Sequence, residues 1–197
     1  MQGIDTARMA VAGLAIALGA AACDSASPTA PGGVAAELAA VRDATRGFHD
    51  IGQAVAAGYG TPVGGHCDES PAGAMGVHSA NQALMGTQEI DARRPEVLLY
   101  LATGGGKYAL VGVEYVQPIL LRNTATGAVA PWFAPEPWPS TFVQVTAKPS
   151  LFGETFQGPM PGHVPGMPWH YDLHVWAWYD NPTGLFAQWN PSLRCSQ

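Results

Sequence analysis

The chain has 197 residues, a formal net charge of −6, and only 12% charged against 47% hydrophobic residues. An acidic balance without a basic patch argues against nucleic acid as a partner. The hydrophobic content is sufficient for the core of one domain, and the 24 glycines and 17 prolines predict many turns and loops.

Residues 1–22 have the pattern of a bacterial lipoprotein signal peptide. Arg8 precedes an uncharged run over residues 9–22, which is shorter than the about 20 residues that a membrane-spanning helix needs. The run ends in small residues before Cys23 and resembles a lipobox, in which the cysteine is acylated, although Ala20 stands where leucine is usual. The alternative is an ordinary A-x-A cleavage site at residues 20–22. Both interpretations predict an extracytoplasmic protein, and the first predicts a membrane anchor at Cys23.

Residues 23–33 are predicted to be the lipidated cysteine and a flexible linker, and residues 34–197 a single domain. Besides Cys23, the chain has only Cys67 and Cys195. In an oxidising compartment these two cysteines favour a disulfide bond. The alternative is that Cys67 joins His66 as a metal ligand.

Within the domain, apolar residues at three- and four-residue spacings predict one long amphipathic helix over residues 34–59. A short helical turn is expected within residues 80–90. Strands are expected at residues 96–103, 108–117, 142–146 and 171–179. Irregular or loop segments are expected at residues 61–80, 124–141 and 151–168. These elements predict an α+β domain, with the long N-terminal helix packed on a mainly antiparallel sheet that has long Gly/Pro-rich loops.

The last predicted strand carries the most informative polar residues. Strand alternation places His170, Asp172 and His174 on one face. Imidazole and carboxylate groups are good ligands for Zn²⁺ and Cu²⁺. Residues four apart on a strand are separated by about 13 Å, so one ion cannot easily be shared by all three. Further ligands are expected from His78, His163 and Glu114.

Glu114 is a candidate because it interrupts the apolar strand over residues 108–117. The alternative is a buried salt bridge between Glu114 and Arg122 or Arg94. A lone histidine is also more often a structural residue than a ligand. A shared ion would require the imidazoles of His78 and His174 and the Glu114 carboxylate to converge within about 4–5 Å.

Tryptophan gives a second candidate site. Trp176 and Trp178 are expected on the same strand face as His174, while Trp132 and Trp138 lie in a Pro-rich loop. Such rings suit stacking on a sugar or another flat ligand, and the alternative is ordinary core packing. No phosphate-binding loop, nucleophile elbow or zinc-finger spacing is present in the sequence.

Several short motifs occur in a characteristic order: MGVH at residues 75–78, PEVLLY at 95–100, LVGVEY at 110–115 and LHVW at 173–176. Gly58-Tyr59, Cys67, Asn181-Pro182 and residues 189–191 (WNP) complete the pattern. In this order the chain, from about residue 40 to 195, resembles an uncharacterised family of secreted bacterial proteins. The resemblance implies that His78, Glu114 and His174 belong to one unit, and it implies no activity.

The sequence therefore predicts an extracytoplasmic, lipid-anchored domain that binds a divalent transition metal, Zn or Cu, through a His/carboxylate cluster. One alternative is a non-catalytic module for a glycan or an aromatic small ligand. Another is a structural envelope lipoprotein. The sequence leaves open whether the domain is an enzyme.

Overall fold

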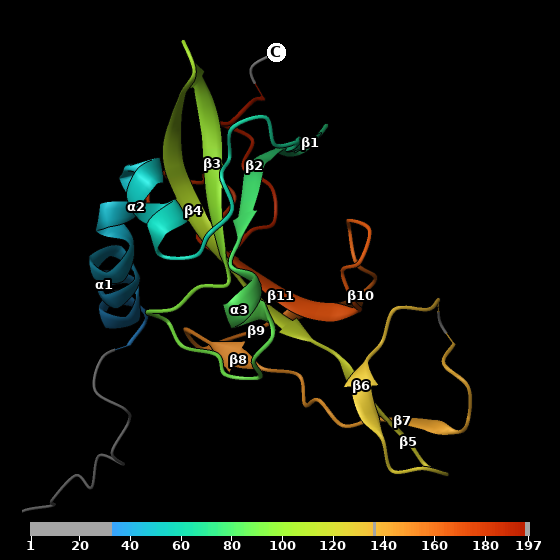
Figure 1. Ribbon diagram of the computed structural model, residues 1–197. Coiled ribbons are helices and arrows are strands. Elements are labelled where there is room, and N and C mark those ends of the chain that lie inside the picture. Colours follow the sequence, from blue (N-terminus) through green and yellow to red (C-terminus); the bar gives the residue numbers. More distant parts are fainter. Residues whose placement is uncertain (1–32, 136, 196–197) are drawn as a thin grey trace, which may run out of the picture. The chain divides into compact units, whose positions relative to one another are not determined.

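A six-stranded antiparallel sheet, in the order β1-β2-β3-β4-β11-β10, holds most of the long strands. The computed structural model, shown in Figure 1, describes residues 33–135 and 137–195. The predicted signal peptide and the predicted lipidation site, Cys23, lie outside these residues. Among the described residues, no helix has the length and apolar character needed to span a membrane.

The strands of this sheet are β1 (Cys67–Ser70), β2 (Gly73–Ala80), β3 (Val97–Gly104), β4 (Lys107–Pro118), β10 (Gln157–Met160) and β11 (His170–Val175). A second, three-stranded sheet consists of β5 (Leu120–Asn123), β6 (Val129–Pro131) and β7 (Phe142–Gln144). The last pair is β8 (Ser150–Leu151) with β9 (Glu154–Thr155). The helical elements are α1 (Val34–Thr45), the 3₁₀ turn η1 (Arg46–His49), α2 (Ile51–Ala56) and α3 (Gln82–Met85).

The predicted fold class is wrong, because the domain is mostly β and has no long N-terminal helix. The helical segment breaks at Asp50, which is extended (φ −89°, ψ 110°) and accepts hydrogen bonds from the backbone N–H groups of Gly52 and Gln53. An aspartate in this position begins a new helix. The apolar spacing changes at the break: Val55, which would continue the stripe of one long helix, is 46% exposed, and Ala54 is buried instead. Val41, Ala54 and Tyr59 enter one core cluster.

The second error concerns residues 61–80, which were expected to be irregular but contain β1 and β2. Gly73 and Gly76 have φ values of 131° and 97°, a region that favours glycine. At Gly76 a Cβ atom would lie 2.5 Å from the carbonyl oxygen of Tyr100 on the neighbouring strand. The glycines that suggested a loop therefore allow two backbones to approach closely.

Shorter strands also occur inside predicted loops, with β6 in residues 124–141 and β9 and β10 in residues 151–168, while β8 lies at the start of the latter segment. The strands expected at residues 96–103 and 108–117 are confirmed as β3 and β4, which pair as a hairpin around residues 104–106. Its three turn glycines, Gly104, Gly105 and Gly106, have φ values of 90°, 59° and 72°. The predicted disulfide is also confirmed, since Cys67 is bonded to Cys195. Cys67 is therefore excluded as a metal ligand.

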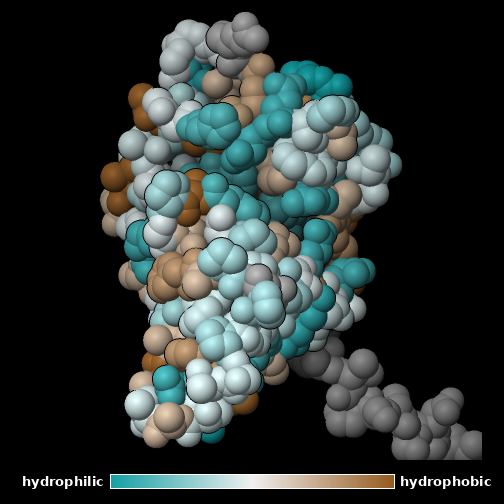
Figure 2. Space-filling view, turned by 90° about the vertical axis from the view of Figure 1, so that its right-hand side faces the viewer, coloured by the Kyte–Doolittle hydropathy of each residue, from teal (hydrophilic) through white to brown (hydrophobic). Residues whose placement is uncertain are grey.

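The two faces of the main sheet differ in what they bury. The larger core cluster contains Leu98, Tyr115 and Leu173 together with the helical residues Val41 and Ala54, and α1 and α2 lie beside β3 and β4 (Figure 1). The smaller cluster comprises Ala74, Val97, Leu99, Val111, Val116, Trp176 and Leu193. Figure 2 views the molecule from the side away from these helices, where hydrophilic side chains gather around a hollow in the upper half.

Candidate metal centre

Strand register brings three chemically active side chains together. His174 on β11 pairs directly with Glu114 on β4, and directly opposed residues of antiparallel strands project from the same face. His78 on β2 is opposite Leu99 of β3, which is in turn opposite Gly112 of β4. Hence β2, β4 and β11 present one donor each on the face that carries the smaller core cluster.

Gly112 on β4 lies where neighbouring strands approach closely. A Cβ atom there would lie 2.9 Å from the carbonyl oxygen of Val175 and 3.4 Å from a methyl carbon of Leu99. The absence of a side chain at Gly112 therefore lets Leu99 and β11 approach β4 closely, next to the Glu114–His174 pair.

The three donors converge as a shared ion would require. His78 Nε2 lies 3.5 Å from Glu114 Oε2, and His174 Nε2 lies 3.9 Å from Glu114 Oε1. One donor atom from each residue can be chosen so that all lie within 4.8 Å of one another. The side chains of Glu114 and His174 are 3% and 1% exposed, and that of His78 is 25% exposed. Convergence within about 4–5 Å is thus confirmed.

Asp68 on β1 is the neighbour that the sequence did not reveal. Its Oδ2 atom lies 2.9 Å from His78 Nδ1, a close ion-pair contact, while its Oδ1 atom lies 3.6 Å from Nε2 of the exposed His66. This contact leaves His78 Nε2 facing Glu114. A metal-binding imidazole commonly contacts a carboxylate through its other nitrogen in this way. Asp68 lay in a segment that was expected to be irregular, so no strand periodicity pointed to it.

The salt bridges considered for Glu114 do not form. Arg94 pairs instead with Glu89, at 3.4 Å, and the partners of Glu114 are His78 and His174. The carboxyl of Asp172 lies within hydrogen-bonding reach of the Glu114 carboxyl. Burial raises the pKa of both carboxyls, so the two groups hold a proton more readily than exposed acids do.

The two histidines of the centre differ in their protonation. Burial, with a contribution from nearby histidines, lowers the pKa of His174 to about 3, so its imidazole is neutral at pH 7. For His78 burial also lowers the pKa, but the carboxylates of Asp68 and Glu114 outweigh it and raise the pKa overall. The neutral imidazole is the form that binds metals, so a cation would have to displace a proton from His78.

Several buried polar atoms of this region lack a hydrogen-bond partner in the protein. They are both ring nitrogens of His174, Nε2 of His170, Nδ1 of His78, whose contact is the Asp68 carboxylate, and both oxygens of Asp172, which have only the Glu114 carboxyl within reach. Buried polar atoms are nearly always paired with protein, water or an ion, because leaving them unpaired costs about 1–3 kcal/mol each. These atoms therefore mark the region as one suited to a polar occupant.

The remaining metal candidates lie beside the converging group. Among the described residues, the group that converges contains only His78, Glu114 and His174. His170 is fully buried, and its ring centroid is 5.0 Å from that of the exposed His163. Asp172 is fully buried as well. Sequence reasoning thus named all three converging residues along with three neighbours that do not join them.

The four candidate tryptophans do not form one surface. Strand β11 ends at Val175, and the two tryptophans that follow separate: Trp176 belongs to the smaller core cluster, on the face of the donors, and Trp178 does not. Trp176 is 2% exposed and donates a hydrogen bond to the carbonyl of Ala187. Trp178 packs against the larger core cluster instead. The other two rings contact further aromatic side chains: Trp132 contacts Phe142, and Trp138 contacts Trp169.

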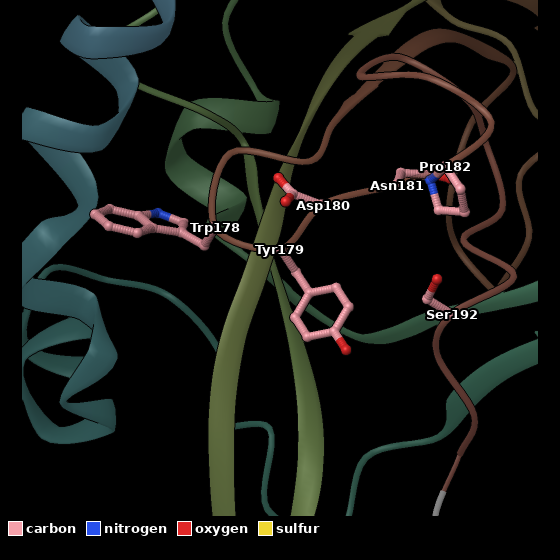
Figure 3. Close-up of a pocket in the computed structure, with 6 residues that line it drawn as sticks. All are labelled: Trp178, Tyr179, Asp180, Asn181, Pro182 and Ser192. Carbon is pink, nitrogen blue, oxygen red and sulfur yellow. The ribbon is translucent and has the colours of Figure 1, made fainter.

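A shallow cavity of about 590 Å³ lies beside Trp178 (Figure 3). Its other lining residues are Tyr179, Asp180, Asn181, Pro182 and Ser192. In Figure 3 the indole of Trp178 points toward the helix and away from the other labelled side chains. Its Nε1 donates to the Thr45 hydroxyl at 3.0 Å. The cavity therefore lacks the paired ring faces that would favour a sugar.

Comparison of the chain with protein-family models, with curated proteins and with solved structures found no match. The resemblance to a secreted bacterial family remains a prediction. The function must therefore be argued from the site.

Proposed function

We propose that this chain is an exported domain that binds a divalent transition-metal ion, Zn²⁺ or Cu²⁺, through His78, Glu114 and His174. The observation that carries the proposal is the convergence of two imidazoles and a carboxylate from three strands, with donor atoms within 4.8 Å of one another. Nitrogen and carboxylate donors are the set that these ions prefer.

The separations fit an ion after an adjustment of the side chains. A tetrahedral ion with bonds of 2.0–2.1 Å holds its donors about 3.3 Å apart. Nε2 of His78 lies 3.5 Å from Glu114 Oε2 and Nε2 of His174 lies 3.9 Å from Glu114 Oε1. The three donors lie within 4.8 Å of one another, so binding one ion would draw them together by up to about 1.5 Å. The partial exposure of His78 gives the ion a route of entry from solvent, because the other two donors are buried.

Charge also favours a cation. Asp68 and Glu114 contact histidines rather than lysine or arginine. A divalent ion would compensate the buried carboxylate and give His174 a partner for its lone pair. Three protein donors leave a fourth position for water or a small molecule, as in catalytic zinc sites. We propose binding as the function, and turnover is no part of the proposal.

The exported location rests on two arguments of different kinds. The Cys67–Cys195 disulfide suggests an oxidising, extracytoplasmic environment. The lipid anchor at Cys23 is proposed from the sequence pattern alone. Mass spectrometry of the protein from a bacterial membrane fraction would test the anchor, because an acylated Cys23 adds a defined mass and an A-x-A cleavage does not.

Metal binding is tested by preparing the protein without chelator, measuring its metal content by mass spectrometry, and titrating the metal-free form with Zn²⁺. We expect a tightly held ion at this centre that is lost in Glu114→Gln and in His78→Ala. His49→Ala is the matched control, because His49 is exposed and contacts Trp178 instead of the cluster. Equal and negligible metal in the wild-type and variant proteins would refute the proposal.

A further inference from the structure

Strand β11 carries buried polar side chains besides the ligand of the proposed ion. His170 and Asp172 are both fully buried, and they project from the same strand face as His174. His170 Nε2 has no hydrogen-bond partner in the protein, and the Asp172 oxygens have only the Glu114 carboxyl within reach. The proposed ion at His78, Glu114 and His174 leaves these atoms unexplained.

The ring of His170 is held in the orientation of a metal ligand. Its Nδ1 atom lies 3.0 Å from the carbonyl oxygen of Pro168, and a carbonyl can only accept, so Nδ1 carries the proton. The lone pair is therefore on Nε2, which is buried and unpaired. An imidazole that donates one N–H to a backbone carbonyl and offers its other nitrogen is the usual arrangement of a metal-bound histidine.

Distance excludes one ion for the whole row. His170 and His174 are four residues apart on a strand, which places their Cα atoms about 13 Å apart. Bonds of about 2 Å cannot span both rings from one point. Asp172 lies between them on the same strand face, with its Cα about 6.6 Å from that of His170. Its carboxyl is next to that of Glu114, and the strand spacing also allows it to share an ion with His170.

A third donor is available at the surface. The exposed His163 ring is perpendicular to His170 within 17°, at a centroid separation of 5.0 Å. It belongs to the segment that joins β10 to β11, and its ring already contacts that of His170. His163 would give the second position an opening to solvent, as His78 does for the first.

From this geometry we infer a second binding position for a divalent transition ion, made by His170, Asp172 and His163 and adjacent to the first. The inference rests on the proposed function, because the first ion is its neighbour. Two ions held by neighbouring carboxylates are a known arrangement in proteins that bind phosphate esters and other oxyanions. The open sides at His78 and His163 suit a small anion that bridges the two ions.

The test is the number of Zn²⁺ ions bound per chain, measured on the metal-free full chain by titration and by metal analysis after desalting. We expect two ions in the wild type. His163→Ala and His170→Gln should each retain one tightly bound ion and weaken the other at least about tenfold. Circular dichroism would establish folding. If His170→Gln does not fold, the test rests on His163→Ala, which should fold because the side chain of His163 is exposed.

The possible results separate the two proposals. One ion in the wild type that is lost in Glu114→Gln but unchanged in His163→Ala and His170→Gln would overturn the second position and leave the first intact. Two ions of unchanged affinity in His163→Ala and His170→Gln would also overturn it. No ion in the wild type would overturn both proposals. His49→Ala should match the wild type in every measurement.

Discussion

Replacing Asp68 by asparagine tests the part of the site that the sequence did not reveal. The carboxylate lies 2.9 Å from His78 Nδ1 and does not reach the proposed ion. Asparagine keeps the size of the side chain but loses the charge that favours the metal-binding orientation and basicity of the imidazole. Losing such a partner typically weakens metal affinity about 10- to 100-fold. Asp68 is 43% exposed, so solvent screening places the expected loss near the lower end, about tenfold.

The assay is competitive titration of Zn²⁺ against a coloured chelator, with Asp68→Asn compared with wild type and with Asp180→Asn. Asp180 is a suitable control because it is exposed and accepts a hydrogen bond only through its backbone carbonyl. The thermal stability of the metal-free proteins should be nearly equal, since Asp68 is half-exposed on a short strand. An affinity unchanged within about twofold in Asp68→Asn would show that the carboxylate does not support the ion, and our reasoning about His78 would be wrong.

Three further predictions concern the fold. Burial raises the pKa of Glu96 from 4.5 to about 7. The unfolded chain therefore releases this proton at a lower pH than the folded chain does. As the pH rises from about 4.5 to about 7, the free energy of unfolding should fall by about 3 kcal/mol. Glu96→Gln keeps an acceptor for the Val116 N–H, and it should remove this fall in free energy when stability is measured by urea titration at several pH values. A pH dependence of stability equal to that of the wild type would contradict this. Replacing both Cys67 and Cys195 by serine should cost about 5 kcal/mol in the chain-entropy estimate for a separation of 128 residues, and an unchanged urea midpoint would refute it. Gly112→Ala should cost about 1–3 kcal/mol, because its Cβ would lie 2.9 Å from the Val175 carbonyl; equal melting temperatures would contradict the crowding.

The sequence predicted the local pieces of the sheet better than their assembly. The β3–β4 hairpin follows from β-branched runs around three glycines, and β11 follows from alternation. The polar residue within an apolar strand, Glu114, and the histidine of the last strand, His174, were sufficient to name the site. Two unassigned cysteines were sufficient to predict the disulfide.

The failures share a physical cause, which is that tertiary contacts decide what a local pattern becomes. Asp50 divides a continuous apolar stripe into short helices, because its side chain caps α2. The glycines of β2 resemble loop residues until β3 is placed against them, and Asp68 gains its role only when β1 pairs with β2. The alternation that placed Trp176 and Trp178 together ends where β11 ends.

The wide spacing of the three donors along the chain also sets when an ion can act. His78, Glu114 and His174 come together only after β2, β3, β4 and β11 have paired, and such long-range pairing forms late and slowly. Metal can therefore bind only the assembled sheet, and it should lower the unfolding rate while leaving the folding rate nearly unchanged. Added zinc should accordingly lower the rate measured in unfolding experiments and leave the rate measured in refolding experiments unchanged.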